Sequence, residues 1–189
     1  MERIRREELL SPKDFSKIAL EEREKIIALK KRRRIESRTF SYLFENRDTV
    51  LNQMNEMILI ENVQDEKEID HILNTYNDLI PGKNQFSVSM FIEISDEKLL
   101  LREMPRLSGI EENVYLVFGD HEVRATPEEG RSTETLESTL QYLKFDFTTE
   151  DVNNFKKSGN AFVVTRHINY KESAEIPEAL LKSLKDEIN

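Results

Sequence analysis

The sequence predicts an α+β fold in which N-terminal helices precede an antiparallel sheet of about five strands, with helices packed on one side. Two observations lead to this class. Up to Pro81-Gly82, apolar residues recur at helical spacing, and beyond it they alternate with polar residues as in half-buried strands. At 189 residues the chain can bury one core, so we expect a single domain, 1–189, with a mostly helical part, 1–81, and a sheet-forming part, 82–189.

The spacing of apolar residues predicts three helices in the helical part, over residues 12–34, 44–61 and 65–80. The first has a typical start, because Ser11 is a good N-cap and Pro12 suits the first helical position. It ends in the basic run KKRRR, where positive charge favours the C-terminal end of the helix dipole. The β-branched and aromatic residues of 35–43 predict a short strand or an extended crossing.

Alternation predicts the strands of the second part, over 86–94, the two arms of 113–125, 140–147 and 160–168. The two arms form a hairpin, because Gly119 suits the first position of a type II′ turn. Helices are expected between and after the strands, over 96–107, 148–159 and 177–188. The polar stretch 126–135 is expected to be a mobile loop.

Charge is distributed unevenly along the chain. Residues 1–38 contain 13 Lys/Arg and 8 Asp/Glu, whereas the remainder contains 15 and 29. An acidic body repels a phosphate backbone, so nucleic acid is an unexpected partner. The basic run within 30–38 is interpreted as a solvated helix end; the alternatives are a contact with an acidic partner, with the molecule's own acidic body or, weakly, with RNA.

Several classes of protein are excluded by composition. The chain has no cysteine, so it has no disulfide, thiolate metal site or cysteine nucleophile. Its aliphatic runs are much shorter than the roughly 20 residues of a membrane helix, and MERIRREELL lacks the apolar stretch of a signal peptide. We therefore expect a cytoplasmic protein that does not enter a membrane. The five scattered glycines form no phosphate-binding motif.

Two charges interrupt the apolar face of the predicted helix 44–61. On a helical projection, Arg47 and Glu61 fall within the arc of its apolar residues. They are 14 residues apart, about 21 Å along a helix, so each needs its own polar companion if it faces inward. Glu93, in an otherwise apolar strand, is a candidate counter-ion for Arg47. The alternative is that both charges reach water at the helix ends or close structural ion pairs.

A mixed carboxylate–histidine metal site is a second hypothesis. Its ligands would come from Glu56 or Glu61, Glu93, His121 and His167, and iron or manganese would suit such a set. No pair of ligands shows the spacing of a helical metal motif, so the pattern is unspecific. A metal-dependent enzyme thus stays an alternative to a protein that only binds.

Read in order, RREELLSPKDFSKI, ALKKRRRI, LFENRDTVLNQMNEMILIE, YNDLIP and GIEENVYLVFGDHE resemble a bacterial family of domains of unknown function. Genes of that family often lie beside genes for rubrerythrin-like diiron proteins and iron–sulfur oxidoreductase-like proteins. The resemblance thus implies a supporting role in handling peroxide or oxidative stress. The site residues that it implies are Glu45, Arg47, Gln53, Glu56, Glu61, Tyr76 and Asn77.

The leading hypothesis is therefore a cytoplasmic accessory protein that binds a redox or iron-handling partner. It would use a polar cluster around Arg47 and the Tyr76-Asn77 turn. The sequence leaves a homo-oligomer open and does not identify a reaction or a ligand.

Overall fold

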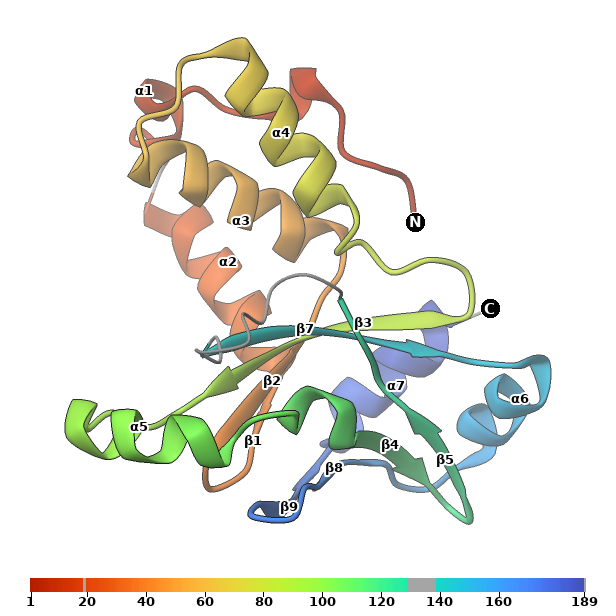
Figure 1. Ribbon diagram of the computed structural model, residues 1–189. Helices are drawn as coiled ribbons and strands as arrows, with labels where there is room; N and C mark the ends of the chain where they lie inside the picture. Colours follow the sequence, from red (N-terminus) through yellow and green to blue (C-terminus); the bar gives the residue numbers. More distant parts are fainter. Residues whose placement is uncertain (19, 129–138, 189) are drawn as a thin grey trace. The chain divides into compact units, whose positions relative to one another are not determined.

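The computed structural model describes residues 1–18, 20–128 and 139–188 (Figure 1). Its helices and antiparallel sheets confirm the α+β class. The chain divides into two compact units: unit 1 comprises Met1–Arg33 and Glu45–Gly82, and unit 2 comprises Arg34–Phe44 and Lys83–Asn189. This grouping resembles the expected helical and sheet-forming parts, except that Arg34–Phe44 joins the sheets.

Unit 1 begins with an extended segment, two short elements, η1 (Arg6–Glu8) and α1 (Pro12–Phe15), and the longer helix α2 (Leu20–Arg32). Ser11 caps α1 as predicted, with its hydroxyl accepting from the Asp14 amide at 3.1 Å. The single helix predicted over 12–34 is wrong, because the chain turns at Ser16 and starts a new helix at Leu20. Arg23 of α2 donates to the backbone carbonyl of Ser16 at 3.1 Å, and so supplies a hydrogen-bond donor to a carbonyl group at the end of α1.

The two remaining helices of unit 1 are α3 (Arg47–Ile60) and α4 (Glu66–Asn77). Asn46 caps α3 by accepting from the Thr49 amide at 2.9 Å. Asp65 caps α4 by accepting from two amides of its first turn. The start of α3 is three residues later than predicted, because Phe44 belongs to the preceding strand.

In unit 2, one sheet has five antiparallel strands in the order β1-β2-β3-β7-β6. Their bounds are β1 Arg34–Glu36, β2 Phe40–Phe44, β3 Gln85–Ile92, β7 Leu140–Asp146 and β6 Thr126–Pro127. The predicted strand at 35–43 is thus a hairpin of two strands. The predicted loop at 126–135 starts with the short strand β6, and its residues from 129 onward lie outside the described residues.

A second antiparallel sheet has the order β5-β4-β8-β9. Its strands are β4 Val114–Phe118, β5 His121–Arg124, β8 Phe162–Arg166 and β9 Lys171–Glu175. The predicted hairpin between β4 and β5 is confirmed: Gly119 has a φ of 56°, as the first position of a II′ turn requires. Strand β9 was not predicted, because its sequence, KESAE, buries only Ala174.

The two sheets enclose one apolar core together with the helical segments of unit 2. These segments are α5 (Glu97–Glu103), η2 (Met104–Arg106), η3 (Ile110–Asn113), α6 (Thr149–Lys157) and α7 (Glu178–Glu187). Four phenylalanines fill the end of the core covered by α6: the ring of Phe155 lies 5.3 Å from both Phe86 and Phe118 and 5.6 Å from Phe147. Within the described part of the chain, no helix is long and apolar enough to cross a lipid bilayer.

Candidate functional site

Arg47 closes a structural ion pair within unit 1, which is the alternative left open by the sequence. Its half-buried guanidinium binds the carboxylate of Glu8, from the N-terminal segment. This hydrogen bond holds the pKa of Glu8 below its ordinary value. Glu93, the expected counter-ion, lies in unit 2, where it is exposed and accepts a hydrogen bond from the Ser41 hydroxyl at 2.5 Å.

Asn77, the second residue expected at the polar cluster, also holds the N-terminal segment. Its amide oxygen accepts from the Ile4 backbone N–H at 2.7 Å, and its amide nitrogen donates to the Ile4 carbonyl at 2.9 Å. Asn55 similarly accepts from the Leu10 amide at 2.9 Å. Together with Arg47–Glu8, these contacts fasten residues 1–10 to α3 and α4, so they are structural. Tyr76 lies half-buried next to Asn77.

Glu45 and Gln53, which the resemblance also implies, lie together at the start of α3. Only 2% of Glu45 is exposed, and its carboxylate accepts from the Thr49 hydroxyl and, at 2.7 Å, from the Gln53 side-chain amide. Arg33, which is also buried, donates to the Glu45 backbone carbonyl at 3.4 Å. A buried carboxylate with several donors fixes local geometry, and its burial leaves little access for a ligand.

The basic run is largely used within the molecule. Lys30 pairs with Glu56 at 2.9 Å, and Arg34 lies over the Phe91 ring with its guanidinium carbon 4.4 Å from the ring centroid. Lys31 and Arg32, in contrast, are exposed and have no ion-pair partner among the described residues. The predicted solvated helix end therefore applies to these two residues.

Glu61 does not face inward. The helical projection extended the apolar arc to position 61, but α3 ends at Ile60 and Glu61 is its exposed C-cap. It lines an open hollow of about 450 Å³ together with residues that follow α3 or lie in α4: Val63, Lys67, Glu68, His71 and Ile72. Val63 and Ile72 are buried and form an apolar floor, and the charged residues form a rim.

The two histidines of the predicted metal site have other roles. His167 Nε2 donates to the Ser108 carbonyl at 3.1 Å, and its Nδ1 accepts from the Asn169 amide at 3.3 Å. Both nitrogens are thus used, which leaves no lone pair for a metal. His121 is exposed and stacks on Phe118 with ring centroids 6.1 Å apart. Within residues 1–18, 20–128 and 139–188, no group of three or more His, Asp or Glu side chains is arranged to hold a metal ion.

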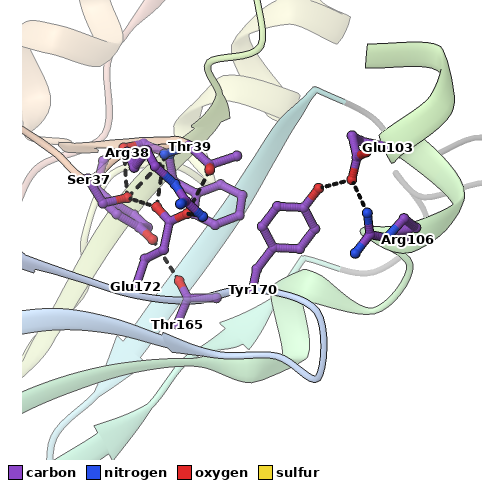
Figure 2. Close-up of polar contacts among 10 residues, drawn as sticks. Ser37, Arg38, Thr39, Glu103, Arg106, Thr165, Tyr170 and Glu172 are labelled. Carbon is purple, nitrogen blue, oxygen red and sulfur yellow. Dashed lines mark hydrogen bonds and ion pairs between the residues drawn. The ribbon is translucent and has the colours of Figure 1, made fainter. Parts of the chain in front are cut away.

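Sequence reasoning missed a partly buried polar cluster in unit 2, around Glu172 of β9 (Figure 2). The Glu172 carboxylate accepts from the Ser37 hydroxyl at 2.7 Å, from the Thr39 amide at 2.8 Å and from the Thr39 hydroxyl at 2.6 Å. Arg38 approaches it at 3.5 Å. Burial opposes the charge, but the hydrogen bonds outweigh it and hold the pKa of Glu172 below its ordinary value. Glu172 therefore joins the β1–β2 turn to β9.

A second missed contact, also drawn in Figure 2, joins Tyr170 to Glu103. The Tyr170 hydroxyl donates to the Glu103 carboxylate at 2.7 Å, and Arg106 binds the same carboxylate at 2.9 Å. Burial and the neighbouring carboxylate raise the pKa of Tyr170 to about 12. The hydrogen bond from Tyr170 in turn lowers the pKa of Glu103. No sequence signal identifies this pair, because its members are 67 residues apart.

Helix α2 differs from the other long helices, because none of residues 23–32 is fully buried. Ile27 is 65% exposed, and Ile60, at the end of the neighbouring α3, is 78% exposed. Exposed Lys31 lies one turn beyond Ile27 on the same face of α2. We call Ile27 and Lys31 of α2, with Ile60 of α3, the α2 surface. Large exposed aliphatic side chains bordered by charges are typical of protein interaction surfaces.

Comparisons with known proteins agree with the resemblance noted from the sequence. A crystal structure of a "novel protein of unknown function" from Burkholderia pseudomallei K96243, solved at 1.90 Å resolution, is 27% identical, with a TM-score of 0.89 and 100% of both chains covered. No curated protein matches the chain. A family model described as "Protein of unknown function (DUF3501)" matches residues 3–188. The chain therefore belongs to the DUF3501 family of proteins of unknown function.

Proposed function

We propose that this protein is a cytoplasmic accessory protein that binds a partner protein through the α2 surface. The proposed partner is a redox or iron-handling protein of the rubrerythrin type. One observation carries the binding role: in α2, a helix of 13 residues, Ile26, Ile27 and Leu29 are all at least partly uncovered. Helices of this length depend mostly on packing for their stability, so a partner that covers α2 would stabilise it.

The identity of the partner is supported by the family resemblance, through genes that lie beside those for rubrerythrin-like proteins. A supporting role in peroxide handling would not require this chain to contain a redox centre of its own. The alternative of RNA binding is less well supported, because Lys30, Arg33, Arg34 and Arg38 of the basic run all have partners within the molecule.

The experiment is a titration of this protein with a purified rubrerythrin-like protein, in which isothermal titration calorimetry measures the heat of binding. We expect saturable binding by the wild type and weaker binding by Ile27→Gln, a change that keeps a residue compatible with a helix. Leu101→Gln is the matched control, because Leu101 is a similarly exposed leucine (63%) on α5 of the other unit. If the wild-type protein gives no heat of binding, the proposed partner is contradicted.

A further inference from the structure

We infer that unit 1 contains a binding site for an extended peptide segment of a partner protein, and that the chain's own residues 1–10 occupy this site as an autoinhibitory strap. We call residues 1–10 the strap. The strap site consists of five side chains from α3, α4 and the residue that follows α4: Arg47, Asn55, Glu66, Asn77 and Asp78. None of these residues belongs to the α2 surface, so the inference goes beyond the proposed function.

Two asparagines bind the strap through its backbone. The side-chain amide of Asn77 pairs with both the N–H and the C=O of Ile4, at 2.7 and 2.9 Å. Asn55 accepts from the N–H of Leu10 at 2.9 Å. A side-chain amide carries a donor and an acceptor, so it can bind the backbone of a residue whatever that residue's side chain is. These contacts therefore suit any extended segment that is correctly placed, from this chain or from another.

Three ion pairs decide which sequence fits the strap site. Each joins a charge of the strap to the opposite charge of the site: Arg3 to Asp78 at 2.8 Å, Arg6 to Glu66 at 3.0 Å, and Glu8 to Arg47. Ion pairs near the surface add little affinity, but complementary charges fix the register and disfavour wrong partners. A segment with the opposite order of charges would meet a like charge at all three positions.

A single aliphatic side chain anchors the strap. Ile4 is 3% exposed, and within residues 1–10 no other side chain is fully buried. The pattern that fits the site is therefore a cation, an aliphatic residue, a second cation two residues later and a carboxylate two residues after that, as in Arg3–Glu8 of the strap, RIRREE. A partner segment with this pattern can make the same contacts.

The strap has the features of a segment that opens locally. It has one buried side chain, its ion pairs lie near the surface, and its regular structure is limited to the three-residue turn η1. Segments with few buried contacts open without unfolding of the rest of the protein. The tether, however, gives the strap a high effective concentration at the site, so a separate segment competes poorly while the strap is closed. This competition makes the strap autoinhibitory.

The test measures fluorescence anisotropy of a labelled synthetic peptide, MERIRREELL, on the full-length protein. Ile4→Asp, in which the strap loses its anchor, should bind the peptide about tenfold more tightly than the wild type. Adding Asn77→Ala to this variant should weaken binding by about tenfold. Glu8→Arg in the peptide should weaken binding similarly, and Arg47→Glu in the protein should restore it. Glu7→Gln is the matched control in the peptide and should change nothing, because exposed Glu7 pairs with Arg5 of the strap itself.

The inference is overturned if the folded Ile4→Asp variant does not bind the peptide, if the Glu8→Arg peptide binds as well as the parent peptide, or if Arg47→Glu does not restore its binding. Circular dichroism shows whether Ile4→Asp is folded. If it is not, amide exchange of the wild-type protein decides. The amides of Ile4 and Leu10 should exchange much faster than those in the middle of α3. Equally slow exchange would show that the strap does not open, and would also overturn the inference.

Discussion

Removal of the Glu172 carboxylate should strongly destabilise unit 2. The Glu172 side chain is only 6% exposed and accepts three hydrogen bonds of 2.6–2.8 Å from Ser37 and Thr39. Hydrogen bonds to a charged group contribute about 1.5–3 kcal/mol each, and bonds that share one acceptor are not additive. We therefore expect Glu172→Ala to lower the free energy of unfolding by about 3–5 kcal/mol, since it leaves the amide and hydroxyl donors of buried Thr39 without their acceptor.

The assay is urea unfolding at pH 7, monitored by circular dichroism. Glu175→Ala is the matched control, because Glu175 is an exposed carboxylate on the same strand and should change stability by less than about 0.5 kcal/mol. The effect of Glu172 should also depend on pH. Its pKa is lower in the folded state than its ordinary value of 4.5, so its stabilisation is present above that value and is lost as the pH falls through the folded pKa. A loss below about 1 kcal/mol at pH 7 would refute this reasoning.

Three further predictions concern other contacts. Asn77→Ala should loosen the N-terminal segment, because it removes both hydrogen bonds to the Ile4 backbone; we expect faster amide exchange at Ile4, and wild-type exchange would contradict this role. Tyr170→Phe should raise the pKa of Glu103 in an NMR titration and destabilise the protein at neutral pH. The difference in stability between variant and wild type should disappear as the pH falls and Glu103 is protonated; an unchanged pKa of Glu103 would argue against the contact. His167→Gln should lower stability by about 1 kcal/mol with unchanged metal content, whereas loss of stoichiometric iron or manganese would revive the metal hypothesis.

Periodicity was sufficient to predict the elements whose own residues supply the buried face. Strand β3 is an example: Phe86, Val88 and Met90 alternate along it and are all buried. Strand β9 has no such pattern, because its place is decided by pairing with β8 and by the hydrogen bonds of Glu172. Elements held in place by distant partners leave little trace in their own sequence.

In the candidate site, too, contacts with residues distant in the sequence could not be predicted. Arg47 closes a structural ion pair, the alternative that its position on the apolar side of the predicted helix left open. The companion was not predictable, because Glu8 is 39 residues away in a segment without periodicity. Glu61 was misplaced because the helical projection holds only within a helix, and α3 ends one residue earlier. The α2 surface was missed because spacing alone does not indicate which apolar residues remain uncovered.

Hydrogen–deuterium exchange of α2 tests the central claim most directly. In the free protein, the backbone amides of residues 23–32 should exchange quickly, because no side chain of this stretch is fully buried. In the presence of saturating rubrerythrin-like partner, the account predicts marked slowing across these residues and at the end of α3, with no change in α5. Unchanged exchange in α2 when the partner is bound would contradict it.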